Sequence, residues 1–228
     1  MKERIGKIGF SIREEIKRPN IEIFEKLKKY TTPNLSDAMN RFRTMSSSIR
    51  PIHDKCCFIG PAITVNVRPG DNLMVHKAID IAKPGDVIVI TTCDCSSNAV
   101  WGELMTRAAV EKGVIGAVIE GGARDIKENA EIGFPIFAKY IVASACDKDG
   151  PGEINEPISC GGVVIFPGDI IIGDENGVVV IQQDSVEEVI ANAENKVTYE
   201  KQRIIDIKKG LIISEDIDNI LRKKGIIN

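Results

Sequence analysis

Two apolar segments with a helical segment between them constrain the fold of this chain more than any other feature. The segments GDVIVI at 85–90 and VIGAVIE at 114–120 are each apolar enough to form a buried strand. Between them, residues from about Ala99 to Lys112 have the spacing of an amphipathic helix, and Gly113 is a typical helix stop. A strand, a helix and a second strand in this order predict a βαβ unit whose strands run parallel.

The rest of the chain places this unit within a larger α/β domain. Short runs rich in valine and isoleucine alternate with turn clusters between residues 58 and 182, which predicts an α/β core. We expect residues 1–50 to form a helical lead-in, in two pieces within IEIFEKLKKY and NLSDAMNRF. We expect residues 185–228 to form a C-terminal helical extension. The sequence therefore predicts one domain over 1–228, with helical segments at both ends.

The tripeptide Pro-Gly-Asp occurs at 69–71, 84–86 and 167–169, in each case beside an extended segment. Turn chemistry explains this recurrence, because proline fixes φ, glycine tolerates positive φ and aspartate bonds nearby backbone N–H groups. The same reasoning predicts a hairpin loop at GDENG, where Asp174, Asn176 and Gly177 form the turn.

Charge and composition limit the kinds of partner that the chain can have. The 228 residues include 33 acidic and 30 basic side chains, a balance too even for a nucleic-acid surface. No apolar run approaches the roughly 18 residues that span a bilayer, and charges occur throughout the first residues. We therefore expect a cytoplasmic protein without a nucleic-acid or membrane partner. In that compartment its six cysteines are expected to stay reduced.

Two segments leave the carboxyl ends of the predicted parallel strands, where ligands bind in such sheets. The first, TTCDCSSNAVWGE, leads into the predicted helix, which Ser96, Ser97 or Asn98 can cap. Unpaired backbone N–H groups around 101–105 can hold an anion there. The second, GGARDIKE, presents Arg124 and Asp125 behind Gly121 and Gly122, which would let a ligand approach the backbone closely.

The neighbouring charges of Arg124 and Asp125 have two interpretations. The planar guanidinium of arginine binds a carboxylate in bidentate fashion, and a lone carboxylate suits a hard divalent cation that keeps several waters. Together they fit a small 2-keto acid bound beside Mg²⁺ or Mn²⁺. Alternatively, Asp125 complements the dipole of the helix that follows, and Arg124 is a solvated partner of Glu128.

The cysteines, the histidines and Trp101 give weaker evidence for a catalytic or metal-binding role. The Cys93 and Cys95 pair lacks the spacing of a structural zinc site, and no second pair accompanies it. With only two histidines, His53 and His76, a Ser-His-Asp triad or a histidine-rich metal site is improbable. His76 can lie near the site, but we expect a packed or capping role for it. We expect Trp101 to pack in a core or an interface.

A larger set of segments, from about Thr32 to Ser185, resembles a known family. These segments are TTPNLSDAMNRF, IRPI, GPAITVNVRPGDNLMVHKAIDIAKPGDVIVI, AVWGELMTRAAVEKGVIGAVIEGGARDIKE, GFPIFA and GGVVIFPGDIIIGDENGVVVI. They resemble the RraA-like family, which includes 4-hydroxy-4-methyl-2-oxoglutarate aldolases and regulators of ribonuclease E activity. The resemblance implies a ββα swivelling-type sandwich assembled as a homotrimer or hexamer, with sites at subunit interfaces.

The resemblance also implies roles for individual residues. In the aldolases the arginine of the Arg-Asp pair contacts the keto acid and the aspartate ligates the divalent cation, which corresponds to Arg124 and Asp125. The helix-start backbone of a Gly-acid-x-x segment binds the pyruvyl carboxylate, and here that segment is Gly102, Glu103, Leu104 and Met105. Glu103 is a candidate for proton transfer or for supporting the site, and Glu200 from a neighbouring subunit is a further candidate.

The function implied is that of a carbon–carbon lyase that depends on a divalent cation. It would cleave a 4-hydroxy-2-oxo acid such as 4-hydroxy-4-methyl-2-oxoglutarate to pyruvate, with oxaloacetate decarboxylation as a second activity. The alternative is a non-catalytic regulator that binds an RNase or helicase partner. The regulators lack the aspartate that follows this arginine, so Asp125 favours an enzyme.

Overall fold

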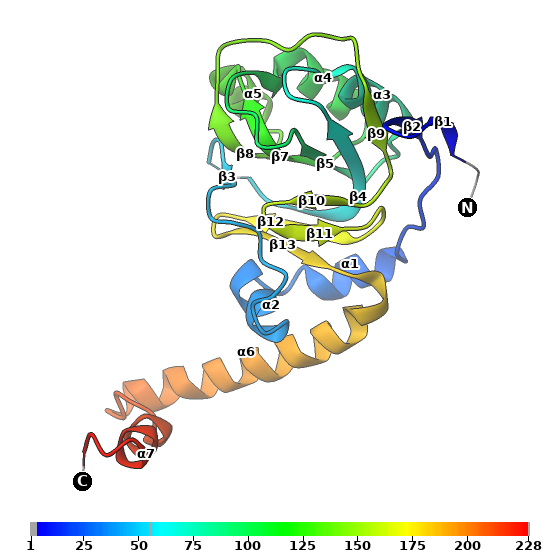
Figure 1. Ribbon diagram of the computed structural model, residues 1–228. Helices are drawn as coiled ribbons and strands as arrows, with labels where there is room; N and C mark the ends of the chain where they lie inside the picture. The colour runs from blue at the N-terminus through cyan, green and yellow to red at the C-terminus, as the bar shows by residue number, and fades with distance from the viewer. Residues whose placement is uncertain (1–3, 55, 228) are drawn as a thin grey trace.

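The computed structural model describes residues 4–54 and 56–227 and shows two layers of strands with helices on both outer faces (Figure 1). The main layer contains parallel β4 (Phe58–Val67), β5 (Val87–Thr91), β7 (Gly116–Ala123) and β8 (Ile136–Ile141), in that order. The predicted pairing of β5 with β7 is confirmed, with Val87 opposite Gly116. These findings confirm the α/β class.

Shorter strands extend this layer at both edges. At one edge β9 (Gly152–Ile154) pairs with β4, and the hairpin of β1 (Ile5–Lys7) and β2 (Phe10–Ile12) continues from it. At the other edge β3 (Arg50–Pro51) pairs with β8. A short strand, β6 (Ala99–Trp101), pairs with the end of β7. The sheet thus includes segments from outside the predicted core.

The second layer is built from two hairpins below the main one in Figure 1. They are β10 (Ile158–Cys160) with β11 (Val163–Ile165), and β12 (Ile170–Asp174) with β13 (Gly177–Ile181). The first half of β4 pairs with β12, which joins the two layers. In the predicted hairpin turn, the Asn176 N–H donates to Asp174 Oδ1 at 2.8 Å.

Period-two alternation along the strands explains how the layers pack. In β5, Ile88 and Ile90 face the helices while Val87 and Val89 face the second strand layer, and all four are fully buried. In β13, Val178 and Val180 face the main layer, whereas Val179 and Ile181 pack against the opposite helices. A strand buried on both faces must be continuously apolar, as these strands are.

Helices cover the two outer faces. Figure 1 shows α3 (Leu73–Ile81), α4 (Glu103–Lys112) and α5 (Ile126–Ile132) over the main layer. On the opposite side lie α1 (Ile21–Leu27), α2 (Thr32–Ala38) and the long α6 (Val186–Lys208), which follows a 3₁₀ turn at Gln183–Ser185. The outer part of α6 extends away from the body and leads to α7 (Glu215–Lys223). Among the described residues, no helix combines the length and the apolar composition that crossing a membrane requires.

The three Pro-Gly-Asp segments form turns, but their aspartates have different partners. Asp86 and Asp169 each accept a hydrogen bond from the backbone N–H three residues earlier, as turn chemistry predicts. Asp86 also binds the Arg18 guanidinium through two hydrogen bonds of 2.8 and 2.7 Å. Asp71 instead accepts from the Leu73 N–H and from a distant loop, which contributes to the site described below.

Two sequence predictions about local structure are wrong. Residues 99–101 form β6 and not the first turn of a helix, because their backbone pairs with β7 and with the loop near Ser144. The cap of α4 is therefore Gly102, not Ser96, Ser97 or Asn98. The lead-in is also not purely helical, because it contains β1 and β2. Residues 1–3 of that segment lie outside the described residues.

Candidate active site

A cavity of about 120 Å³ lies where β6, the start of α4 and the end of β7 meet the start of α3. The segment between β8 and β9 closes part of its rim. The lining residues are Asn72, His76, Ala99, Trp101, Gly102, Leu104, Met105, Arg124, Asp125, Ala145, Cys146 and Lys148. Gly102, Leu104, Met105, Arg124 and Asp125, all predicted for the site, line this cavity, whereas the candidates Glu103 and Glu200 do not.

The Arg124–Asp125 pair crosses from the end of β7 to the start of α4. Asp125 precedes α5 in the left-handed conformation, with φ of 57°, and its side chain does not cap that helix. Instead, Asp125 Oδ2 accepts a hydrogen bond from the Glu103 N–H at 3.0 Å and lies 3.5 Å from Arg124 Nε. Asp125 therefore complements α4 across the cavity and not its own helix.

Gly102 is the residue against which this pair packs. A Cβ atom at Gly102 would lie 2.6 Å from Asp125 Oδ2 and 3.2 Å from Arg124 Nε. Such distances are too short for any side chain, because the neighbouring carboxylate and guanidinium would have to move. Glycine at this position thus allows the charged pair to reach the first turn of α4.

The first turn of α4 presents backbone N–H groups at the cavity. The Glu103 N–H is used by Asp125, and the Met105 N–H donates to Gly102 O at 3.1 Å. The Leu104 N–H has no hydrogen-bond partner among the described residues. Helix N-termini attract anions through such N–H groups and the helix dipole. The Glu103 side chain lies away from the lining and pairs with Arg107 at 2.8 Å.

A buried chain of hydrogen bonds holds Arg124 in place. Trp101 Nε1 donates to Thr106 Oγ1 at 2.8 Å, and Thr106 Oγ1 donates to Asn129 Oδ1 at 2.6 Å. Asn129 Nδ2 in turn donates to the Arg124 backbone oxygen at 2.8 Å. The Trp101 ring also stacks on Phe134, so its expected role in core packing is confirmed. The sequence analysis did not identify Thr106 or Asn129, whose contacts arise only when α4 and α5 pack together.

A second set of side chains lines the same cavity from the start of α3 and from the loop after β8. Asn72 is buried, whereas His76 and Lys148 are exposed. Although His76 is exposed overall, partial desolvation beside the cavity lowers its pKa below the usual value, and the nearby charge of Lys148 lowers the pKa further. The expectation that His76 can lie near the site is confirmed, since His76 lines the cavity. The expected packed or capping role is not found, because the residue is exposed and its ring forms no hydrogen bond with another described residue.

Asp71 joins these two elements. Its Oδ1 accepts from the Leu73 N–H at 2.9 Å, and its Oδ2 accepts from the Asp149 and Gly150 N–H groups at 2.7 and 2.8 Å. Burial alone would raise the pKa of Asp71, but these backbone donors and Arg68 hold it below its usual value. The buried carboxylate therefore fixes the loop that carries Lys148 against the start of α3.

The glycines before Arg124 have a structural role. A Cβ at Gly121 would meet Thr92 Oγ1 at 2.6 Å, and a Cβ at Gly122 would meet Asn98 O at 2.6 Å. The interpretation that these glycines admit a ligand is therefore wrong, because the close approach is by the chain itself.

The remaining candidates lie apart from this chemistry. Among the described residues, no group of three or more His, Cys, Asp or Glu side chains could hold a metal ion. All six cysteines are free thiols, and the ring nitrogens of His53 contact the backbone oxygens of Asp54 and Phe134. Glu200 lies on α6, where its side chain accepts a hydrogen bond from Asn34.

Comparison with known proteins identifies relatives over most of the chain. Residues 32–180 match the model of a family described as RraA-like, Aldolase/RraA. A protein of Halalkalibacterium halodurans, provisionally named 4-hydroxy-4-methyl-2-oxoglutarate aldolase, is 39% identical over 183 residues, covering 80% of this chain and 87% of that protein.

Two solved structures have the same fold. An uncharacterized protein from Pseudomonas syringae superposes with a TM-score of 0.76 at 27% identity, covering 86% of this chain and 92% of that one. A Thermus thermophilus protein described as an RNA-processing inhibitor has a TM-score of 0.62 at 26% identity, covering 67% and 92%. Aldolase and inhibitor names thus both occur among the relatives.

Proposed function

The chain belongs to the RraA-like family, and we propose that it is a carbon–carbon lyase that releases pyruvate from a 4-hydroxy-2-oxo acid. The observation that carries this proposal is the position of the Arg124–Asp125 pair beside an unpaired N–H at the start of α4, within one cavity. A 2-keto acid has a carboxylate and a keto oxygen on adjacent carbons. These two acceptors match the unpaired N–H and the Arg124 guanidinium. Oxaloacetate decarboxylation would form the same enolate and is proposed as a second activity.

The roles of the protein groups follow from their chemistry. The Leu104 N–H and the adjoining first turn of α4 bind the pyruvyl carboxylate. Arg124 binds the substrate through its planar guanidinium and stabilises the negative charge that develops on the keto oxygen. Asn129 holds the backbone of Arg124, and Gly102 leaves room for the pair. A role for the Glu103 side chain in proton transfer stays a prediction.

Asp125 is the group proposed to hold a divalent cation. Its Oδ2 accepts from Glu103, while Oδ1 has no hydrogen-bond partner among the described residues and is available to a cation or its waters. A single carboxylate suits Mg²⁺ or Mn²⁺, which keeps several waters, and does not suit zinc. When bound, the cation would supply positive charge for the enolate oxygen.

A coupled assay tests this proposal directly. Pyruvate release from oxaloacetate and from 4-hydroxy-4-methyl-2-oxoglutarate is followed with lactate dehydrogenase, with Mg²⁺, with Mn²⁺ and with EDTA. We expect release that depends on the cation and returns when the chelator is titrated with Mg²⁺. Absence of pyruvate from both acids under all conditions would contradict the proposal.

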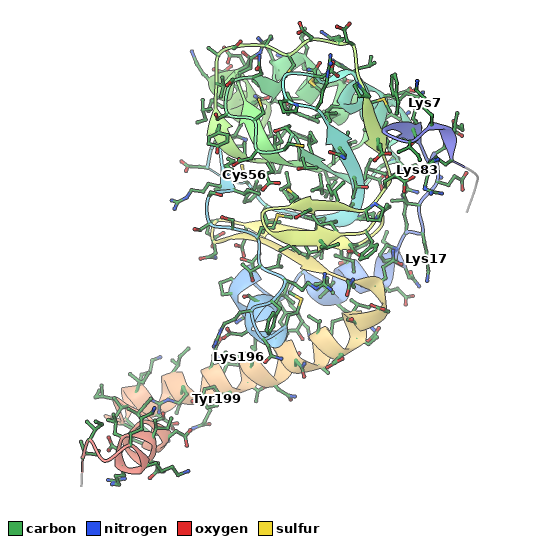
Figure 2. All side chains as sticks on the ribbon, viewed as in Figure 1. Lys7, Lys17, Cys56, Lys83, Lys196 and Tyr199 are labelled. Atoms are coloured by element: carbon green, nitrogen blue, oxygen red, sulfur yellow. The ribbon has the colours of Figure 1, made fainter. Side chains whose placement is uncertain are left out.

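We also propose that the chain forms a homotrimer or hexamer. Tyr199 lies on the part of α6 that extends beyond α2 (Figure 2), and it is 52% exposed. Ile204, Ile205 and Ile207, on the same part, are each about half exposed. Such apolar surface favours a second copy as its cover. Sedimentation at micromolar concentration tests this, and a stable 25 kDa monomer would contradict it.

A regulatory role is the alternative within this family. The observation that favours it is the likeness in fold to the Thermus thermophilus protein, which is described as an RNA-processing inhibitor. In that case the chain would bind an RNase or helicase partner and release no pyruvate from either acid. The coupled assay therefore separates the two functions.

A further inference from the structure

The start of α3 carries two cavity-lining side chains that the proposed chemistry has not used. Asn72 and His76 are four residues apart, which places them on the same face of a helix. The His76 N–H donates to the Asn72 backbone oxygen at 3.2 Å, so the two are joined by a helical hydrogen bond. Both line the cavity that contains Arg124 and Asp125.

Asn72 has an unsatisfied acceptor at this position. Asn72 is 7% exposed, and its Nδ2 donates to Val100 O at 3.3 Å, while Oδ1 has no hydrogen-bond partner among the described residues. The contact with Val100 O fixes which end of the amide is the donor. A buried acceptor without a partner costs about 1–3 kcal/mol. Oδ1 itself has almost no accessible surface, but Asn72 lines the cavity, so a ligand hydroxyl that donates to Oδ1 once the amide turns toward the cavity would remove that cost.

His76 is a proton acceptor that is not already occupied. Its ring forms no hydrogen bond with another described residue, although it lines the cavity. The charged groups around this cavity are Lys148, Arg124 and Asp125. Partial desolvation and the charge of Lys148 lower the pKa of His76, which favours the neutral ring that can accept a proton.

We propose that Asn72 and His76 bind the C4 hydroxyl of the 4-hydroxy-2-oxo acid and that His76 takes the hydroxyl proton when the C3–C4 bond breaks. This rests on the proposed function. The O–H electrons form the new C4 carbonyl, and the electrons of the C3–C4 bond form the pyruvate enolate. The proton on the His76 ring then returns to C3 of the enolate and gives pyruvate. Oxaloacetate has no C4 hydroxyl, so its decarboxylation gives His76 no proton to take, and C3 of that enolate receives its proton from water.

The test compares the two substrates in His76→Gln and Asn72→Ala. General base catalysis contributes roughly 10²–10⁴-fold, so the kcat/KM of His76→Gln for 4-hydroxy-4-methyl-2-oxoglutarate should fall by roughly 10²-fold. The fall for oxaloacetate should be far smaller, so the ratio of the two values changes by about the same factor. Asn72→Ala should change that ratio by roughly 10-fold, as expected when a hydrogen bond to a substrate hydroxyl is lost.

Two further measurements separate this role from damage to the helix. Lys77→Gln alters the adjacent exposed residue of α3, which does not line the cavity, and should leave both activities unchanged. Oxalate resembles only the pyruvyl half of the substrate, so its inhibition constant should be the same in the wild type and in His76→Gln.

Each other outcome overturns the inference. If His76→Gln lowers both activities equally, or if Lys77→Gln has the same effect, the residue supports the fold or the enolate and not the hydroxyl. If the wild type decarboxylates oxaloacetate but cleaves no hydroxylated acid, the pyruvyl chemistry stands and the hydroxyl-binding role fails. If the wild type acts on neither acid, the proposed function itself fails.

Discussion

The two sides of the cavity are built in different ways. On one side, Gly102, Arg124 and Asp125 are held by short backbone contacts and by the fully buried Thr106 and Asn129. On the other, His76 and Lys148 are exposed side chains on separate elements that Asp71 joins. The first side is therefore fixed by the backbone, whereas the second is defined by side chains that can change without moving the sheet.

Because the two sides differ in this way, we expect substitutions on them to have two kinds of effect. Changes on the Arg124 side should lower turnover of both proposed substrates, because both acids contain the pyruvyl group. Changes on the α3 side should mainly alter selectivity and local stability. The following experiments test that division, from the largest expected effect to the smallest.

Asp125→Asn should have the largest effect. It keeps an oxygen for the Glu103 N–H but removes the negative charge proposed to hold the cation, so kcat/KM for oxaloacetate should fall by about 10³-fold. The measurement is pyruvate release at saturating Mg²⁺. Asp94→Asn, which alters an exposed carboxylate paired with Lys139, is the control and should stay near wild type. A variant of Asp125 that keeps most of its turnover would contradict the assignment.

Arg124→Lys should lower kcat/KM for both acids by roughly 10²-fold, because lysine carries the charge without the planar pair of donors. The comparison is with Glu128→Gln. An exposed ion pair between Arg124 and Glu128 would be worth only about 0.5 kcal/mol, and lysine would serve it equally well. If both variants remain close to wild type, the Arg124 side of the cavity is not a site.

Asn129→Ala should lower kcat/KM for both acids by about 10-fold, because the Arg124 carbonyl loses its donor and Thr106 loses its acceptor. It should also reduce the free energy of unfolding by about 1–3 kcal/mol. Asn192→Ala removes a similar amide-to-carbonyl hydrogen bond, to Ala38 on the distant helical face, and serves as the control. Equal kinetic losses in both variants would argue against a positioning role.

Asp71→Asn should have the smallest kinetic effect, a few-fold, but should reduce the free energy of unfolding by about 1–3 kcal/mol at pH 7. The folded pKa of Asp71 is lowered, so its carboxylate stabilises the fold above the unfolded pKa near 3.9 and loses that contribution as pH falls through the folded value. The difference between wild type and variant in urea unfolding should therefore narrow at acidic pH.

Asp80→Asn is the matched control for this experiment. Asp80 is an exposed carboxylate on the same helix, paired with Lys77, so its replacement should change stability little at any pH. A difference between wild type and Asp71→Asn that stays constant from pH 7 to acidic pH would contradict the proposed contribution of the Asp71 carboxylate.

The sequence predicts the Arg124 side of the cavity well for a physical reason. Strands such as 87–91 are buried on both faces and so appear as continuous apolar runs, which locate the carboxyl edge of the sheet. The charged residues immediately after 116–123 must then lie at that edge. Residues 99–101 are misassigned because alanine, valine and tryptophan continue the apolar pattern of the helix, while their pairing with β7 is long-range.

The α3 side could not be predicted in the same way. Nothing local in the sequence distinguishes Asn72 or His76 from ordinary helix-start and helix-surface residues. Their importance comes from the loop at 142–151, which Asp71 draws against α3 through hydrogen bonds across more than 70 positions of the chain. Only the assembled fold brings these side chains to the cavity that contains Arg124.

The space around Gly102 has a practical consequence for directed evolution of substrate range. In a mutant library that randomises Gly102, we expect clones without glycine at this position to lose the proposed activity, since even a methyl group there displaces the Asp125 carboxylate. Leu104 lies two positions further on, is 80% exposed and also lines the cavity, and Lys148 is exposed on the opposite element. Substitutions at 104 and 148 would vary the side chains that face the rest of the substrate, while the groups proposed to bind its pyruvyl end are retained.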